Sequence, residues 1–182
     1  MRKPMNIDFE RCTSGIEFEE WVKELLGQLR MKAERVVKND CGIDIIAIAA
    51  VNKNTTKRVY IQCKYYNKPL GKGPIQEIFA GTAHHKDYGE PVVITNNYVT
   101  FEARRYAKDL AVEIIAAPEW EEFRRINIEG RVDNPNQHTG LFGLMIAVLL
   151  KDKDYFDKVI TSAEGEKIKN KNELKLQIIS EF

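Results

Sequence analysis

The segment from Gly42 to Tyr66, GIDIIAIAAVNKNTTKRVYIQCKYY, constrains the fold more than any other stretch of the sequence. Two apolar runs rich in β-branched residues flank the polar run NKNTTK, which is typical of two β-strands joined by a turn. These strands nevertheless carry Asp44, Gln62 and Lys64. Because a charged group that is buried without a partner loses its solvation, each of these side chains needs a partner, a metal or a catalytic role.

The order of apolar patterns along the chain predicts an α/β fold. A helix is expected after Ser14, since Ser14 and Glu17 have the spacing of a capping box and an apolar stripe follows. The runs AERVVK, IDIIAIAA and RVYIQCKYY predict an antiparallel meander of three strands. A helix starting near Pro74, the strand PVVITNN, a helix capped by Thr100 and the strand VEIIA then alternate. This order predicts a mixed sheet covered by helices.

The pattern changes after the strand VEIIA. A further helix is expected in PEWEEFRRIN, and the polar run EGRVDNPNQHTG is the best candidate for a linker. We therefore expect one domain over residues 1–128, and a linker with a small helical appendage over residues 129–182. The longest apolar run, Leu141 to Leu150, is far shorter than the roughly 20 residues that a membrane span needs, so no membrane partner is expected.

Composition excludes few functions. With 43% hydrophobic and 30% charged residues, the chain is typical of a globular protein, and its net charge of +1 excludes a globally basic nucleic-acid coat. The three cysteines are widely spaced and form no CxxC pair, so neither a disulfide framework nor a zinc knuckle is expected. The N-terminal residues have no apolar run typical of a secretory signal. These features predict a cytoplasmic protein in a reducing setting.

Side-chain alternation brings the polar residues of the two strands together. Gln62 and Lys64 lie on one face of their strand, and pairing of the two strands around the polar turn would place Asp44 near both. A fourth polar group comes from the first helix. At about 100° per residue, Glu19 lies at the border of the apolar stripe, where it is better placed than its neighbouring glutamates to lean toward the sheet.

Such a set supports metal-assisted hydrolysis of phosphodiesters. Mg²⁺ prefers oxygen ligands, which the carboxylates of Asp44 and Glu19, the amide oxygen of Gln62 and the main-chain carbonyl of Cys63 would supply. Lys64 would orient the attacking water or stabilise the transition state. The alternative interpretation is structural: Asp44 and Lys64 would form a buried ion pair that braces the two strands.

The order GIEFE, CGIDIIA and IQCK, followed by a helix and VVITNNYVTFEARRYA, resembles the Mrr-like branch of the PD-(D/E)xK restriction-endonuclease-like nucleases. In that branch glutamine often replaces the second acid, which gives the pattern D…QxK. The resemblance covers roughly residues 14–117 and implies a restriction-endonuclease-like mixed β-sheet flanked by helices. It also implies Asp44, Gln62, Lys64 and Glu19 as catalytic residues of a Mg²⁺-dependent endodeoxyribonuclease, with Mn²⁺ as a substitute.

The run KYYNKPLGKGPIQ follows the predicted site and mixes lysines with tyrosines. It suits a loop that contacts phosphates and stacks on bases, although an ordinary solvated loop fits the composition equally well. The residues expected to contact DNA are Tyr65, Lys68, Lys72, Gln76 and Arg104.

We therefore expect an endonuclease that acts on DNA in restriction, phage defence or repair. The alternatives are a nuclease similar to Holliday-junction resolvases and a catalytically silent DNA-binding module of the same fold. A homodimer is expected, since one active site cuts one strand and two related sites cut a duplex. The apolar helix at residues 141–150 is expected to contribute to the dimer contact.

Overall fold

The computed structural model describes residues 5–50, 56–134 and 137–151, so most of the expected C-terminal appendage lies outside the described residues. The described chain has an α/β fold with one mixed sheet in the order β1-β2-β3-β4-β5. The strands are β1 (Lys32–Asp40), β2 (Ile43–Ala50), β3 (Thr56–Lys64), β4 (Glu90–Thr95) and β5 (Glu113–Ile115). The helices are α1 (Gly15–Gln28), α2 (Gly73–His84), α3 (Phe101–Asp109), α4 (Ala117–Glu129) and α5 (Gly140–Leu150).

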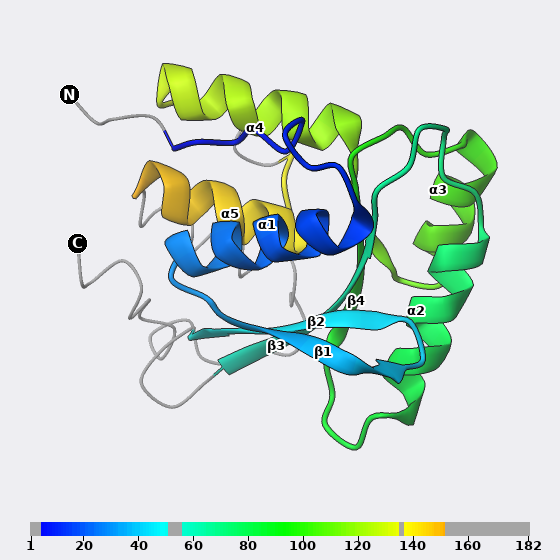
Figure 1. Cartoon of the computed structure of the whole chain (residues 1–182). Coiled ribbons are helices and arrows are strands. Elements are labelled where there is room, and N and C mark those ends of the chain that lie inside the picture. Colours follow the sequence, from blue (N-terminus) through cyan, green and yellow to red (C-terminus); the bar gives the residue numbers. More distant parts are fainter. Residues whose placement is uncertain (1–4, 51–55, 135–136, 152–182) are drawn as a thin grey trace.

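Helices cover both faces of the sheet (Figure 1). The first three strands are antiparallel, and β3, β4 and β5 run parallel to one another. The larger core lies on the face covered by α1, α4 and α5, and a smaller core lies on the face covered by α2 and α3. The predicted three-stranded meander and the mixed sheet flanked by helices are thus confirmed, and the restriction-endonuclease-like fold class with them.

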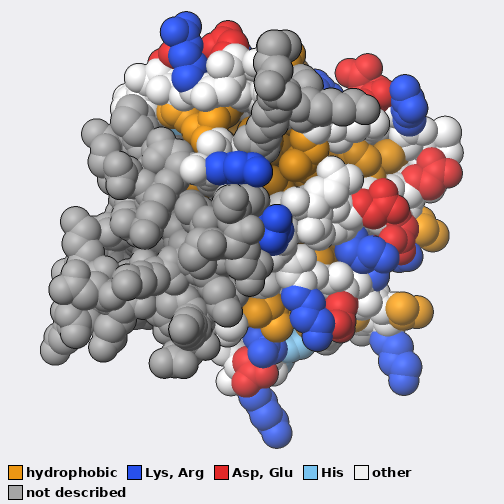
Figure 2. Space-filling model, turned by 90° about the vertical axis from the view of Figure 1, so that its left-hand side faces the viewer, with side chains coloured by type: hydrophobic (Ala, Val, Ile, Leu, Met, Phe, Trp, Pro, Cys, Tyr) orange, Lys and Arg blue, Asp and Glu red, His pale blue; other side chains and the backbone are white. Residues whose placement is uncertain are grey.

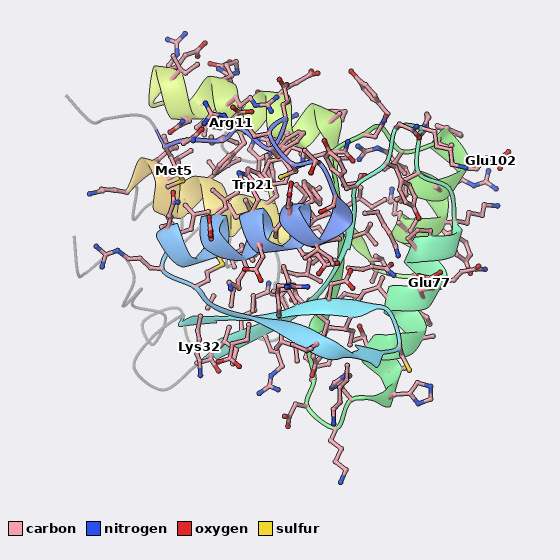
Figure 3. All side chains as sticks on the ribbon, viewed as in Figure 1. Met5, Arg11, Trp21, Lys32, Glu77 and Glu102 are labelled. Atoms are coloured by element: carbon pink, nitrogen blue, oxygen red, sulfur yellow. The ribbon has the colours of Figure 1, made fainter. Side chains whose placement is uncertain are left out.

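An aromatic cluster fixes α1 on the larger core. Trp21 of α1 lies 5.3 Å from Phe9 and 5.3 Å from Trp120 between ring centroids, and Figure 3 shows it between α1 and α4. Ser14 caps α1 through the N–H of Glu17, as predicted. The Glu17 carboxylate, however, accepts the N–H of Thr13 instead of closing the expected capping box onto Ser14. The aromatic packing sets the rotation of α1, and thereby the direction of its polar residues.

The turn between β1 and β2 is packed against α2. Cys41 and Gly42 form this turn with positive φ values of 50° and 84°. Gly81 of α2 leaves room for the carbonyl of Cys41, because a Cβ at position 81 would clash with that oxygen. The close contact brings the middle of α2 over the ends of β2 and β3.

The apolar helix α5 is buried almost completely. Its residues pack against α4 and β5 within the larger core. The carboxylate of Glu113 in β5 accepts the backbone N–H groups of Leu141 and Phe142 at 2.7 and 2.8 Å, so it caps the start of α5. Within the described residues, every helix is too short or too polar to cross a bilayer.

Candidate active site

The ends of β2 and β3 place three of the predicted site residues around one hollow. Ile45 pairs with Ile61, so Asp44 lies opposite Gln62 in the register of the two strands. Asp44, Gln62 and Lys64 line a hollow of about 470 Å³. Its other wall comes from the β1–β2 turn and from α2, which contributes Glu77 and His84.

Asp44 is held in the hollow by the backbone of the neighbouring strand. Its Oδ2 accepts a 2.7 Å hydrogen bond from the N–H of Cys63. Burial raises the pKa of Asp44, and the hydrogen bond from Cys63 partly offsets this rise. The negative charge of Glu19 also raises this pKa, whereas the positive charges of Lys64 and Arg35 lower it. A buried carboxylate with a raised pKa gains from a nearby cation, because a cation stabilises its ionised form.

Gln62 is almost fully buried, with 1% of its surface exposed. Its Nε2 donates a 2.6 Å hydrogen bond to Oε2 of Glu77, while its Oε1 is buried without a hydrogen-bond partner among the described residues. Nζ of Lys64 lies 3.6 Å from the same Glu77 oxygen. Within the described chain the ion pair of Lys64 is therefore with Glu77, and Asp44 is not among its ion-pair partners. This geometry weakens the interpretation of Asp44 and Lys64 as a bracing pair.

Glu19 comes from α1 on the other face of the sheet and does not line the hollow. Its Oε2 accepts hydrogen bonds from Nε and Nη2 of Arg35 at 3.1 and 2.9 Å. The same guanidinium reaches Glu20 through Nη1 at 2.8 Å. Glu19 is close enough to affect the pKa of Asp44, but in this structure its charge is neutralised by Arg35.

The donor atoms around the hollow suit a hard cation. The free oxygen of Gln62 and the carboxylate of Asp44 are the kinds of ligand that Mg²⁺ prefers. Across the described residues, no group of three or more His, Cys, Asp and Glu side chains has the arrangement of a metal site. The residues therefore fit an ion held by few protein oxygens, with water and phosphate filling the remaining positions, better than a closed zinc site.

Two residues that we expected to contact DNA are engaged within the protein. The hydroxyl of Tyr65 donates to the carbonyl of Cys12 at 2.7 Å, and its ring packs 5.4 Å from that of Phe18. Arg104 forms a two-pronged hydrogen bond with Glu119 at 3.0 and 2.9 Å. Both side chains thus have a structural role in this conformation.

The other expected DNA contacts lie at the surface near α2. Lys68 is exposed, and Lys72 lies 5.7 Å from the ring centroid of Tyr106 and 4.0 Å from the carboxylate of Glu102. Gln76 donates to the hydroxyl of Tyr106 at 3.3 Å, so it is directed toward α3 and does not line the hollow. The side of the molecule away from α2 and α3 is shown in Figure 2, where lysines and arginines are interspersed with acidic residues over the described part.

Sequence reasoning missed Glu77 and Arg35. Glu77 neighbours Gln76, the residue of α2 that we expected to contact DNA, but Glu77 lines the hollow whereas Gln76 is directed toward Tyr106. Arg35 lies in a strand whose alternation is irregular, because the register shifts between Arg35 and Asp40. A basic residue opposite the helix acid is the signal that would have pointed to Arg35.

Comparison with known proteins identifies the family of the chain. A family model described as a restriction endonuclease, the Mrr catalytic domain, matches residues 11–123, which is more than half of the chain. The chain belongs to this family of restriction-endonuclease-like nucleases. No curated protein matches it significantly. Among solved structures, the chain is similar to the crystal structure of a protein of unknown function, AF1548, with 20% identity, 90% of this chain and 91% of that chain covered, and a TM-score of 0.49.

Proposed function

We propose that the protein is a Mg²⁺-dependent endonuclease that hydrolyses phosphodiester bonds of DNA, and that the hollow at the ends of β2 and β3 is its active site. One observation carries the proposal. The buried Oε1 of Gln62 has no partner among the described residues, and it belongs to a hollow that Asp44 and Lys64 also line. An unpartnered buried acceptor is costly, and a cation held between it and the Asp44 carboxylate would satisfy both.

Each residue of the proposed active site is assigned a role. Asp44 and Gln62 would hold the ion, and the Cys63 N–H fixes the Asp44 carboxylate. The main-chain carbonyl of Cys63 and the carboxylate of Glu19 stay predicted ligands. A bound Mg²⁺ lowers the pKa of a coordinated water and offsets phosphate charge. Lys64 presents its ammonium to the hollow, where a fixed positive charge stabilises the negative charge that develops on the attacked phosphate.

The proposal includes DNA as the substrate and restriction, phage defence or repair as the setting. It is tested by incubating supercoiled plasmid with the protein and Mg²⁺ or Mn²⁺, and by following nicked and linear products. Cleavage that depends on metal and stops with EDTA supports the proposal. Retention of DNA without cleavage would instead favour a catalytically silent DNA-binding module. Parallel reactions on methylated plasmid, a four-way junction and RNA identify the substrate class.

The homodimer is proposed on chemical grounds, since duplex cleavage is simplest with two sites related by a two-fold axis. The apolar residues of α5 are already buried in the core, so they do not supply the contact that we expected from the sequence. Analytical ultracentrifugation at tens of micromolar, with and without a DNA duplex, tests the proposal. A monomer under both conditions would contradict it.

A cytoplasmic setting also stays a prediction, based on the free cysteines Cys12, Cys41 and Cys63.

A further inference from the structure

Helix α2 contributes a carboxylate that contacts two members of the D…QxK motif. Oε2 of Glu77 accepts the 2.6 Å hydrogen bond from Nε2 of Gln62 and lies 3.6 Å from Nζ of Lys64. Figure 3 shows where Glu77 extends from α2, on the side of that helix nearer the strands. Glu77 also lines the same hollow as Asp44. It is therefore in direct contact with the proposed catalytic residues although it lies outside the motif.

The contact with Glu77 determines which end of the Gln62 amide faces the hollow. An ionised carboxylate only accepts hydrogen bonds, so the amide must turn its NH₂ group toward Glu77. The reversed amide would place two acceptor oxygens 2.6 Å apart. Oε1 of Gln62 is consequently the end left without a protein partner among the described residues.

The β1–β2 turn packs closely over this pair. A Cβ at Gly42 would lie 3.0 Å from Nε2 of Gln62 and 3.1 Å from Cβ of Glu77. Gly42 also has a φ of 84°, which favours glycine. The turn therefore restricts the space in which the amide could rotate away from Glu77.

We propose that Glu77 is a positioning residue, which holds the Gln62 amide with its oxygen turned toward a divalent cation and keeps the Lys64 ammonium in the hollow. This inference rests on the proposed function. It also explains why this chain has an amide at position 62. A carboxylate there would lie against the carboxylate of Glu77, whereas an amide and an acid form a matched donor and acceptor. If the amide and the carboxylate exchange positions, as in the double variant Gln62→Glu and Glu77→Gln, the hydrogen bond between the two side chains should be kept.

The exchange gives a test that needs neither metal nor DNA. Melting temperatures are measured in EDTA at neutral pH for the wild type, Gln62→Glu, Glu77→Gln and the double variant. We expect Gln62→Glu to melt lower than the wild type, because it sets two carboxylates together, and the double variant to recover most of the loss. Effects of the two substitutions that simply add would overturn the inference, since residues in contact couple and independent residues do not.

Nuclear magnetic resonance provides a spectroscopic readout of the same contact. The side-chain amide signals of Gln62 are assigned as those missing from Gln62→Glu. We expect one of these protons to resonate at unusually low field in the wild type, because it is donated to a charged acceptor at short distance. In Glu77→Ala that shift should return to the range of a solvated amide. A shift that does not respond to Glu77→Ala would contradict the assigned orientation.

Metal titration then distinguishes a Glu77 that orients the metal ligand Gln62 from a Glu77 that only stabilises the fold. For Glu77→Ala, we expect the Mn²⁺ concentration at half-maximal thermal stabilisation to rise about tenfold or more, the usual scale for residues that orient metal ligands. The concentration at half-maximal nicking should rise in parallel. Glu24→Ala, which removes an exposed glutamate of α1, is the matched control and should leave both unchanged. A Glu77→Ala protein that is less stable but has an unchanged half-saturation would show a mere brace and overturn the inference.

The two proposals fail in different ways. If the wild type binds Mn²⁺ but cuts none of the tested nucleic acids, the proposed function is wrong. The role of Glu77 is then decided by the half-saturation of the thermal shift alone, with a tenfold rise supporting it and no rise overturning it.

Discussion

Arg35 of β1 holds the carboxylate of Glu19 of α1 through two hydrogen bonds to Oε2, 3.1 Å from Nε and 2.9 Å from Nη2. A third hydrogen bond joins the guanidinium to Glu20, so one arginine pairs with the carboxylates of two consecutive residues of α1. These contacts raise the pKa of Arg35, with the hydrogen bond to Glu20 as the largest cause. Arg35 thus ties α1 to the edge of the sheet and competes with any metal for Glu19.

Removal of Arg35 should destabilise the protein more than removal of an ordinary surface arginine. Arg35→Ala leaves Glu19, whose side chain is 19% exposed, without its cation, and we expect the free energy of unfolding to fall by about 1–3 kcal/mol. Arg58→Ala is the matched control. Its partner Asp87 is 68% exposed, so its loss should cost less than about 1 kcal/mol. Urea unfolding at pH 7 measures both, and equal losses would contradict the structural role of Arg35.

The same variant tests Glu19 as a metal ligand. If Glu19 must leave Arg35 to bind the ion, Arg35→Ala should increase the rise in melting temperature that Mn²⁺ produces, because the competing cation is gone. The experiment is a melting curve with and without Mn²⁺ for the wild type and Arg35→Ala. A rise of the same size in both proteins would remove Glu19 from the ligand set.

Asp44 should account for most of the metal response. Asp44→Asn keeps a side-chain oxygen that can accept the Cys63 N–H. It removes the negative charge of a carboxyl group whose pKa is raised by burial. We expect this variant to melt at or above the wild-type temperature in EDTA. We also expect it to lose most of the stabilisation that Mn²⁺ gives the wild type, which is about 2.7 kcal/mol at a hundredfold excess over the dissociation constant.

Asp87→Asn is the control for the Asp44 experiment, since Asp87 is exposed and lies outside the hollow. It should keep the full metal response. If Asp44→Asn keeps it as well, Asp44 is not a ligand.

Glu113 should make stability depend on pH. Burial raises its pKa from 4.5 to about 7, although two backbone N–H groups of α5 partly offset the rise. Between these two pH values the folded state binds more protons than the unfolded state, so the contribution of Glu113 to stability falls as the pH rises. The loss between pH 4.5 and pH 8 should be about 1–3 kcal/mol, where the lower value allows for the partial exposure of the residue.

Glu113→Gln isolates the pH-dependent contribution of Glu113 to stability, because an amide does not titrate in this range. Melting temperatures at pH 5.5 and pH 8 are compared for the wild type and the variant. We expect the wild type to lose more stability than Glu113→Gln on going to pH 8. Equal losses would show that Glu113 titrates normally.

The meander and its three polar residues could be predicted from the sequence because strand alternation and a polar turn determine the register. That register puts Asp44 opposite Gln62, and two-residue periodicity puts Lys64 beside Gln62. The start of α1 was predictable from its cap at Ser14. In each of these cases a local rule acts on a few neighbouring residues.

The residues that contact this site could not be predicted, because their contacts join segments that are distant in the sequence. Glu77 is a half-exposed glutamate between the buried Ile75 and Ile78 of α2, and helical spacing alone does not distinguish it from Gln76. Only the packing of the β1–β2 turn against α2 decides which of the two reaches Gln62.

Two of the expected DNA contacts are engaged within the protein for a related reason. Tyr65 packs on Phe18, and Arg104 binds Glu119 from a different helix. The sequence shows an aromatic and a basic side chain near the site, but it does not show the partners that fold onto them. Long-range pairs of this kind follow only from the three-dimensional arrangement.

The nicking rate of Lys64→Ala at saturating Mn²⁺, compared with that of the wild type at equal folded fraction, tests the central claim most directly. Lys64 pairs with Glu77 at 3.6 Å, and Glu77 is 55% exposed, so the substitution should change the melting temperature little. If Lys64 stabilises the transition state, the rate should fall by about 10² or more. A rate that falls only in proportion to the folded fraction would contradict the account, because Lys64 would then hold the strands together without acting in catalysis.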